Sequence, residues 1–208
     1  MKTILILGGT QMLGRDFVET LLLDREKYDI TLANRGITNK NLFPDLKKLK
    51  IDRDSEESYN PLEHVNFDLI IDFSCYRKEQ LIQTLKHAKY QKYILISTQS
   101  VFDTQLISSN NYTNEYWKYC YNKKEIEDYV YDNKIFTITI VRPCAVYGDN
   151  DYTNRFEKKE NIYYWRHNGA RASDTKGCIS VQSVTEILIG LVKKEQIEEE
   201  KISFYNIG

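Results

Sequence analysis

The sequence predicts an α/β fold, a doubly wound parallel sheet covered by helices on both faces. Short apolar runs alternate with segments of helical periodicity along the 208 residues, and this alternation is typical of βαβ units. The first apolar run ends in a glycine turn that opens a helix. A later run ends in hydroxyl side chains, and ligands of such folds bind at the carboxyl ends of the strands.

Length and composition favour one well-buried domain with a small appendage. The formal net charge is −1, which argues against nucleic acid or a membrane as a partner. No apolar run approaches bilayer length and the chain enters a strand at once, so we expect a cytoplasmic protein without a signal peptide. Scattered cysteines without a C-x-x-C spacing predict reduced thiols and no metal site: Cys75, Cys120, Cys144 and Cys178.

The first predicted strand, residues 3–7, runs into the glycine turn and then a helix. The helix is indicated by apolar residues at helical spacing, namely Phe17, Val18, Leu21 and Leu22. Strand, turn and helix in this order point backbone N–H groups and the positive end of the helix dipole at a phosphate. We therefore predict that a pyrophosphate binds at Gly8, Gly9, Thr10, Gln11, Met12, Leu13 and Gly14.

The glycines of this turn have separate expected roles. Gly8 allows the tight turn, Gly9 leaves the backbone bare, and Gly14 lets the helix pack closely on the strand. Gln11 stands where the dinucleotide fingerprint has its middle glycine. The alternative is therefore an ordinary tight turn between a strand and a helix.

The second predicted strand starts at Tyr28 and is followed by Asn34, Arg35 and a glycine. In a dinucleotide-binding fold, the end of this strand holds the adenosine ribose. Neutral Asn34 removes the repulsion between an acidic side chain and a ribose phosphate, and Arg35 offers a guanidinium, with Arg15 near the turn. This favours NADP as the cofactor. NAD is the alternative, and a solvated arginine would show the same pattern.

The following elements alternate in the same way. We expect a helix at residues 79–89 and strands at 49–51, 67–74 and 93–98. The last of these strands ends in Ser97 and Thr98, which a parallel sheet places at its ligand-binding edge. The alternative is a hydroxyl group that only finishes a strand.

A Y-x-x-x-K pair, Tyr119 and Lys123, lies in the first turns of the next predicted helix. The helix follows a polar loop at residues 103–116 and is indicated by apolar residues at 126–130. The i, i+4 spacing brings the two side chains together. The chain has 16 tyrosines, so the pair can arise by chance as a surface contact. Its place just after a hydroxyl-ended strand favours a functional role.

The last part of the chain starts with a sixth predicted strand at residues 136–141. Arg155, Arg166 and Arg171 then lie beside aromatic residues in a stretch of little periodicity. Because a guanidinium fork matches phosphate oxygens, we expect at least one of the three to approach the cleft above Thr98 and Tyr119, with solvated arginines as the alternative. A helix at 183–194, a solvated charged run at 193–201 and a strand at 202–205 complete the prediction.

Several stretches, in order, resemble the extended short-chain dehydrogenases/reductases, the NAD-dependent epimerase/dehydratase group that modifies nucleotide sugars. They are Gly8-Gly9-Thr10 with Gly14, Asn34-Arg35-Gly36, Asp52-Arg53, Ser97-Thr98 with Val101-Phe102, Tyr119 with Lys123, Arg142-Pro143 with Val146-Tyr147-Gly148, and Tyr205-Asn206-Ile207-Gly208. A turn without the middle glycine occurs in an atypical branch of that group. The resemblance spans the whole chain, and motifs in order are more specific than any single one.

The resemblance implies a Rossmann-like NAD(P)-binding domain at residues 1–150, on which the last helix and strand near 179–208 pack back. It implies a small, truncated C-terminal substrate-binding region, residues 151–178, that binds a nucleotide sugar through Thr98, Arg155, Arg166 and Arg171. The implied cofactor site contains Gly8, Gly9, Thr10, Gln11, Met12, Leu13, Gly14, Asn34, Arg35, Asp52, Arg53, Phe73, Ser74, Ser97, Tyr119, Lys123 and Pro143.

The resemblance also implies catalytic roles. Tyr119 would be the general acid/base, Lys123 its partner and the ribose anchor, and Thr98 the hydroxyl that holds the substrate oxygen. A phenol has a pKa of about 10, and a nearby ammonium together with an oxidised nicotinamide would lower it. The phenolate could then take a sugar hydroxyl proton while hydride moves to the cofactor.

The implied reaction is an epimerase-type hydride transfer. The dehydratases of the group have Asp-Glu after the catalytic threonine, where this chain has Gln99-Ser100, so dehydration is disfavoured. A nucleotide keto-sugar reductase is one alternative. A non-catalytic NADP-binding regulator or RNA-associated protein is another. A homodimer is a further open expectation.

Overall fold

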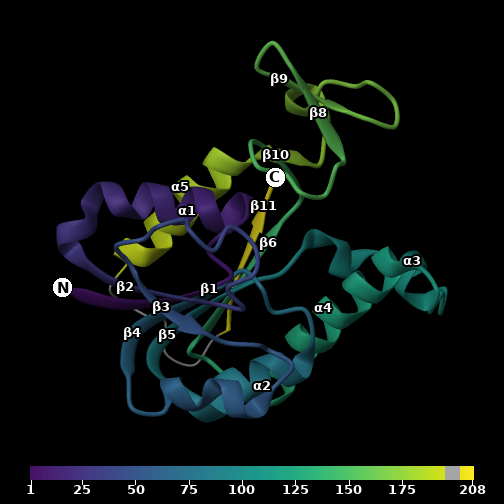
Figure 1. Ribbon diagram of the computed structural model, residues 1–208. Coiled ribbons are helices and arrows are strands. Elements are labelled where there is room, and N and C mark those ends of the chain that lie inside the picture. Colours follow the sequence, from purple (N-terminus) through teal and green to yellow (C-terminus); the bar gives the residue numbers. More distant parts are fainter. Residues whose placement is uncertain (195–201) are drawn as a thin grey trace.

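The computed structural model describes residues 1–194 and 202–208. Within them, seven strands form one parallel sheet in the order β11-β6-β5-β4-β1-β2-β3 (Figure 1). The strands are β1 (Lys2–Leu7), β2 (Tyr28–Asn34), β3 (Lys47–Lys50), β4 (Asn66–Asp72), β5 (Lys89–Ile96), β6 (Ile138–Pro143) and β11 (Ser203–Ile207). The predicted parallel α/β fold is confirmed. The strand order reverses between β1 and β4, and such a reversal opens a crevice at the carboxyl ends of the strands.

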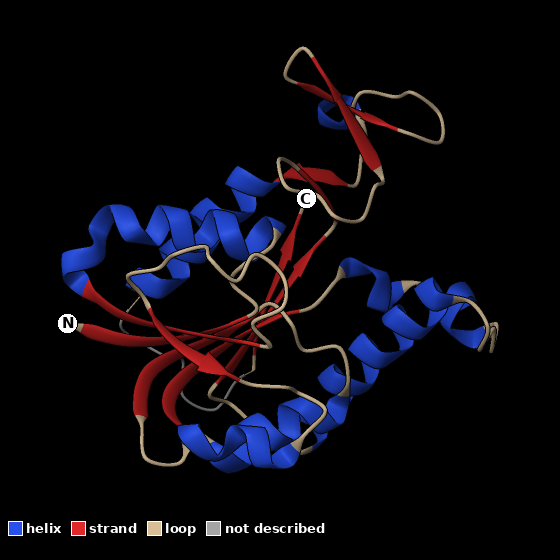
Figure 2. Ribbon diagram, viewed as in Figure 1, coloured by secondary structure: helices blue, strands red, loops and turns tan. Residues whose placement is uncertain are grey.

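Helices cover both faces of this sheet (Figure 2). Helices α1 (Met12–Leu21) and α5 (Val181–Lys193) lie together on one face, and α2 (Lys78–His87) and α4 (Glu115–Asp132) lie on the other. In β1, Ile4 and Ile6 belong to the core under α1 and α5, whereas Leu5 and Leu7 belong to the opposite core. Successive side chains of a strand point to opposite faces, and both faces are covered, so the strand is apolar throughout.

The polar stretch at residues 103–116 is more ordered than the predicted loop. It contains a short helix, α3 (Thr104–Ser108), whose first turn is capped by the Asp103 side chain, which accepts from the N–H of Leu106 at 2.8 Å. The indole N–H of Trp117 donates to the carbonyl of Ile107 at 3.1 Å and ties α3 to α4. The apolar pattern of the sequence did not reveal α3, because a helix this short shows no apolar stripe.

The segment between β6 and α5 forms two small sheets. Strand β7 (Ala145–Tyr147) pairs in parallel with β10 (Cys178–Ser180), and β8 (Phe156–Lys159) and β9 (Ile162–Trp165) form a hairpin. The hairpin extends away from the central sheet (Figure 1). Its aromatic side chains pack on one another, with the Phe156 and Trp165 ring centroids 4.3 Å apart.

The chain then returns to the central sheet through α5, and β11 pairs with β6. The helix begins where the Ser180 hydroxyl accepts from the N–H of Ser183 at 3.1 Å. The charged run expected at residues 193–201 falls largely outside the described residues, which resume at residue 202. None of the helices in the described parts of the chain has the length and apolarity needed to cross a membrane.

Candidate functional site

A cavity of about 780 Å³ lies at the carboxyl ends of the sheet strands. It brings together most residues of the predicted site: Gly8, Thr10, Gln11, Met12, Leu13, Gly14, Asn34, Arg35, Asp52, Arg53, Phe73, Ser74, Ser97, Thr98, Tyr119, Lys123, Pro143 and Arg155. These residues come from the ends of six strands, from two helices and, for Arg155, from the segment before β8, so the fold gathers groups that are far apart in the sequence.

The glycine turn has the tight geometry that its spacing predicted. Gly8 has φ of +85°, and a Cβ atom on Gly14 would lie 2.3 Å from the carbonyl oxygen of Gly8. Gln11 is extended, at φ −133° and ψ 146°, a conformation that any residue adopts. A glycine is therefore not required at that position, and the left-handed conformation falls instead on Met12, at φ 35°.

Gly9 does not have the role expected from the sequence. A Cβ atom at this position would lie 3.0 Å from side-chain atoms of Ile6, Val18 and Leu32. Gly9 thus faces the core between β1, β2 and α1, and it makes room for packing. It is not among the residues that line the cavity.

The N-terminus of α1 is suited to an anion. Gln11 caps it without a side-chain hydrogen bond, and the first turn of this described helix contains no acidic residue. The first N–H groups of a helix have no partner inside the helix and lie at the positive end of its dipole. Together with the narrow approach at Gly14, this backbone fits a pyrophosphate group.

The end of β2 is followed by a turn that carries the guanidinium of Arg35. The Asn34 side chain accepts from the N–H of Gly36 at 2.8 Å and so shapes the turn, and exposed Arg35 lines the cavity beside it. Arg15 is directed elsewhere, since its guanidinium donates to Glu19 at 2.8 Å and to Asn150 at 2.9 Å. Arg35 is therefore the arginine at this end that a ribose phosphate could reach.

Arg53 lines the cavity and also has a structural role. Its side chain is 9% exposed and donates to both carboxylate oxygens of Asp72, at 2.6 and 2.7 Å. Its other partners are Tyr59, Ser74, Gln80 and Thr84. The N–H donors of the guanidinium are occupied by the protein, so Arg53 supports the cavity wall.

Helix α4 places Tyr119 and Lys123 one turn apart on the wall of the cavity. Lys123 is 3% exposed, and its Nζ donates to the carbonyl oxygens of Cys75 and Ile96, both at 2.7 Å. Burial lowers the pKa of this ammonium, because water no longer solvates its charge.

Burial has the opposite effect on the phenol. It raises the pKa of Tyr119 well above its ordinary value, and the Arg155 charge and the Thr98 hydroxyl oppose the shift only in part. The ligand-free Tyr119 is therefore protonated at neutral pH. A phenolate would need an additional positive charge close to the ring.

The two hydroxyls at the end of β5 differ in their partners. The Thr98 hydroxyl accepts from the N–H of Ser100 at 3.2 Å and lies on the cavity wall. The Ser97 hydroxyl donates to the buried carboxylate of Glu127, which pairs with Arg142. Ser97 thus lines the cavity but supports an internal ion pair, whereas the Thr98 hydroxyl on the cavity wall donates to the Ser100 hydroxyl at 3.3 Å.

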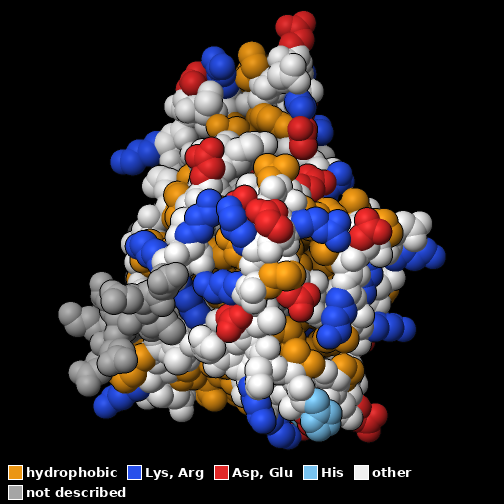
Figure 3. All heavy atoms as spheres, turned by 90° about the vertical axis from the view of Figure 1, so that its left-hand side faces the viewer, with side chains coloured by type: hydrophobic (Ala, Val, Ile, Leu, Met, Phe, Trp, Pro, Cys, Tyr) orange, Lys and Arg blue, Asp and Glu red, His pale blue; other side chains and the backbone are white. Residues whose placement is uncertain are grey.

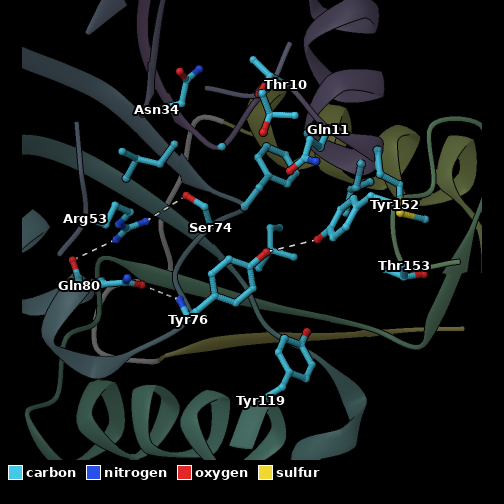
Figure 4. Close-up of a pocket in the computed structure, with 18 of the residues that line it drawn as sticks. Thr10, Gln11, Asn34, Arg53, Ser74, Tyr76, Gln80, Tyr119, Tyr152 and Thr153 are labelled. Atoms are coloured by element: carbon cyan, nitrogen blue, oxygen red, sulfur yellow. Dashed lines mark hydrogen bonds between the residues drawn. The ribbon is translucent and has the colours of Figure 1, made fainter. Parts of the chain in front are cut away.

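The cavity is also lined by residues that were not predicted to belong to the site, among them Tyr76, Ser100, Tyr116 and Tyr152. Figure 4 shows Tyr76 between the glycine turn and Tyr119, with its hydroxyl directed at Tyr152. The hydroxyls of Ser100 and Tyr116 lie 2.7 Å apart. A signal existed for Tyr116, which stands three residues before Tyr119 on the same helix face. No local signal marks Tyr152.

The three C-terminal arginines separate in the structure. Arg155 lines the cavity, and its Nε donates to the Thr153 hydroxyl at 2.9 Å. Arg166 donates to the carbonyl of Phe156 at 3.2 Å within the hairpin. Arg171 lies beside the hairpin, where it bridges to Tyr164. One of the three thus reaches the cavity that contains Thr98 and Tyr119.

The surface charge is mixed. On the face that lies to the left in Figure 1, lysine and arginine side chains are interspersed with aspartate and glutamate (Figure 3). The formal net charge of the chain is −1. This face therefore lacks the positive electrostatic field that would attract a polyanion.

No protein-family model matches the sequence, and a search of curated proteins found no match. Solved structures do match. A short-chain dehydrogenase/reductase from Veillonella parvula is 13% identical with a TM-score of 0.67, over 100% of this chain and 94% of that one. ADP-L-glycero-D-manno-heptose-6-epimerase from Helicobacter pylori is 16% identical with a TM-score of 0.67, over 100% and 76%.

A third similar structure is UDP-glucuronic acid 4-epimerase from Bacillus cereus, solved with UDP-glucuronic acid and NAD. It is 17% identical with a TM-score of 0.64, over 99% of this chain and 77% of that chain. Identities this low establish similarity of fold. The chain therefore has the fold of the short-chain dehydrogenases/reductases and of nucleotide-sugar epimerases.

Proposed function

We propose that the protein binds a nicotinamide dinucleotide and catalyses an epimerase-type hydride transfer on a nucleotide sugar, with Tyr119 as the acid/base. One observation carries the proposal: a single cavity joins the uncapped N-terminus of α1 to Thr98, Tyr119 and Lys123. The solved structures of similar fold include nucleotide-sugar epimerases and an NAD complex, which supports the same assignment.

The chain's own residues would divide the work as follows. The N–H groups at the start of α1 bind the pyrophosphate, and Arg35 binds the ribose phosphate that distinguishes NADP from NAD. Thr98 holds the reacting oxygen, and Tyr119 takes or returns its proton. The bound nicotinamide supplies the hydride chemistry. Its positive charge in the oxidised form favours the phenolate of Tyr119 and so opposes the effect of burial.

The surroundings of Thr98 support hydride transfer over dehydration. Gln99 donates from its side-chain amide to the carbonyl of Ile207 at 3.1 Å, so the residue after the threonine is engaged in holding β11. The carboxylates that line the cavity, Asp52 and Asp54, follow β3 at the opposite end of the sheet. A leaving hydroxyl near Thr98 would therefore lack a carboxylic acid to protonate it.

Two other functions are compatible with the same cavity. A keto-sugar reductase would use the same Thr98 and Tyr119. A cofactor-binding protein without catalysis is favoured by one observation, that the Lys123 ammonium already donates to two backbone carbonyls. Turnover with a nucleotide sugar separates these candidates.

The cofactor assignment is tested by titrating the protein with NADPH and NADH while nucleotide fluorescence is recorded. We expect NADPH to bind more tightly by about 1–3 kcal/mol, the strength of charge-assisted hydrogen bonds to a phosphate. Arg35→Ala should remove this preference while leaving NADH affinity within about twofold, because NADH has no phosphate there. Equal affinities in the wild-type protein would contradict the NADP assignment.

The catalytic assignment is tested with a panel of UDP-, dTDP-, GDP- and ADP-sugars. Once a substrate turns over, Tyr119→Phe should lower kcat by about 10²–10⁴-fold, the usual contribution of a general acid/base. The matched control is Tyr131→Phe, because Tyr131 lies on the same helix and is 67% exposed. Unchanged turnover in the Tyr119 variant would reject its role. Dinucleotide binding without turnover of any sugar would favour the non-catalytic candidate.

A further inference from the structure

Tyr76 covers the ammonium of Lys123. It lies in the loop between β4 and α2, where its N–H donates to the Gln80 side chain at 2.9 Å. The Lys123 Nζ lies 5.3 Å from the centroid of the Tyr76 ring and 5.8 Å from that of Tyr119. The two backbone carbonyls that accept from Lys123 complete the surroundings. The ammonium is thus enclosed between carbonyl oxygens and the faces of two tyrosine rings.

This arrangement conflicts with an open cofactor site. Lys123 is on the cavity wall, yet it is only 3% exposed, so a ligand hydroxyl has little access to its ammonium. Of the two rings, Tyr76 is the less constrained, since it is 42% exposed and belongs to a loop. Tyr119 is half-buried and belongs to α4. Access to Lys123 therefore depends on Tyr76.

The tip of Tyr76 is held loosely. Its hydroxyl lies 3.4 Å from the hydroxyl of Tyr152, across the cavity. This separation is long for a hydrogen bond between hydroxyls, so the contact costs little to break. Movement of the Tyr76 ring would open Lys123 and the space between Tyr76 and Tyr152 at the same time.

We propose that Tyr76 is an internal competitor for Lys123, covering the ammonium in the ligand-free protein and leaving it when a dinucleotide binds. The inference rests on the proposed function in one respect, that a dinucleotide occupies this cavity. A cation over an aromatic face is attracted more strongly when both are shielded from water, and this attraction has to be given up on binding. Burial also lowers the pKa of Lys123, which agrees with such shielding.

Equilibrium binding of NADPH tests the proposal without a substrate. Tyr76→Ala removes the competing ring, so its dissociation constant should fall roughly three- to thirtyfold, the range that cation–π strengths correspond to. Tyr76→Phe keeps the ring over the ammonium and loses only the contact with Tyr152. Its dissociation constant should stay within about twofold of the wild-type value. Tyr131→Ala is the matched control and should bind as the wild type does.

A double-mutant cycle shows whether the effect acts through Lys123. In a Lys123→Met background, Tyr76→Ala should no longer tighten binding, because no ammonium remains to be uncovered. Unchanged or weaker NADPH binding by Tyr76→Ala in the wild-type background would overturn the proposal. A gain of the same size in both backgrounds would also overturn it, since the ring would then be blocking space and not the ammonium.

The two proposals fail in different ways. If the wild-type protein bound neither NADPH nor NADH, both the proposed function and the proposed competition between Tyr76 and the dinucleotide would be rejected. Wild-type binding with no gain in Tyr76→Ala would reject the competition alone. Thermal melting of each variant, expected to be cooperative and near that of the wild type, confirms that binding differences do not come from unfolding.

Discussion

Burial controls the chemistry of single residues in this protein more than neighbouring charge does. The phenol of Tyr119 has a raised pKa although Arg155 opposes the shift, and the ammonium of Lys123 has a lowered one although the surrounding groups include carboxylates. Both shifts favour the neutral form. A ligand that brought positive charge close to the ring would favour the phenolate of Tyr119.

Asp68 provides a residue-scale prediction of pH dependence. Its carboxylate accepts from the N–H of Thr3 at 2.7 Å and from the Thr3 hydroxyl at 2.9 Å, and these bonds lower its pKa. The stabilisation is thus present above the unfolded value of 3.8 and is lost as the pH falls through the lower folded pKa. Asp68→Asn should reduce the free energy of unfolding at pH 7 by about 1 kcal/mol.

Urea denaturation at pH 7 and at pH 2.5 checks this prediction. The difference between wild type and Asp68→Asn should shrink at the lower pH, because protonation of the folded carboxylate removes the stabilisation that its lowered pKa provides. Exposed Asp45→Asn is the control and should change stability little at either pH. A difference that is the same at both pH values would contradict the assignment to an ionised carboxylate.

Single-residue roles were predicted from the sequence only where the role depends on local geometry. Gly14 was predicted correctly as the point of close approach, because helix and strand are adjacent in the chain. The ion pair of Arg53 was not predicted, because its partner Asp72 is brought to it by tertiary structure. Tyr76 was missed for the same reason, as its neighbour Lys123 lies on a distant helix.

Alanine substitutions at two helical glycines should have opposite effects on stability. A Cβ atom on Gly14 in α1 would collide with the backbone of Gly8, whereas nothing lies within 4 Å of a Cβ atom on Gly190 in α5. Gly14→Ala should destabilise the protein by about 1–3 kcal/mol through overpacking and weaken NADPH binding at least about tenfold by moving the turn. Gly190→Ala should stabilise it by about 0.5–1 kcal/mol, because alanine favours the helix.

Thermal or urea denaturation together with NADPH titration measures both variants. The contrast between the two is the informative result, since each exchanges the same glycine for the same alanine within a helix. Gly14→Ala with wild-type stability and affinity would show that α1 can shift away from β1, contrary to the tight packing described here.

Elements with a strong repeating pattern were predicted well, and those held by distant contacts were not. The apolar runs of β1, β4 and β5 and the periodicity of α4 are visible in the sequence because they are buried on defined faces. Helix α3 was not predicted, since it depends on the cap from Asp103 and the tie from Trp117. Strand β5 starts at Lys89, earlier than expected, because pairing with β4 extends through polar residues.

At the scale of the whole molecule, the Arg53–Asp72 pair joins several elements behind the cavity. Asp72 ends β4 and also accepts from the Tyr93 hydroxyl of β5 at 2.6 Å, while Arg53 contacts α2 through Gln80 and Thr84. Arg53→Met should lower the free energy of unfolding by about 3–5 kcal/mol, because it leaves a buried carboxylate without its partner.

The control for this prediction is an exposed pair of the same kind. Lys86 pairs with Glu56 on the surface, and both side chains are more than half exposed, at 59% and 53%. Lys86→Met should cost less than about 1 kcal/mol in urea denaturation. The double variant Arg53→Met with Asp72→Leu should recover much of the loss, since it removes the unpaired charge. Similar losses in the free energy of unfolding for Arg53→Met and Lys86→Met would show that the buried pair stabilises the fold no more than the exposed pair does.

The parallel sheet also has a consequence for the order of events in folding. Within the described residues, every pairing in the central sheet is parallel, so each requires a crossover through intervening chain before the first contact forms. The β8–β9 hairpin needs only a short turn, and such hairpins form within about 1–10 μs. Sheets built from distant segments assemble in milliseconds to seconds. After a denaturant jump, the aromatic hairpin should therefore report an early phase, and the cavity should appear only in the late one.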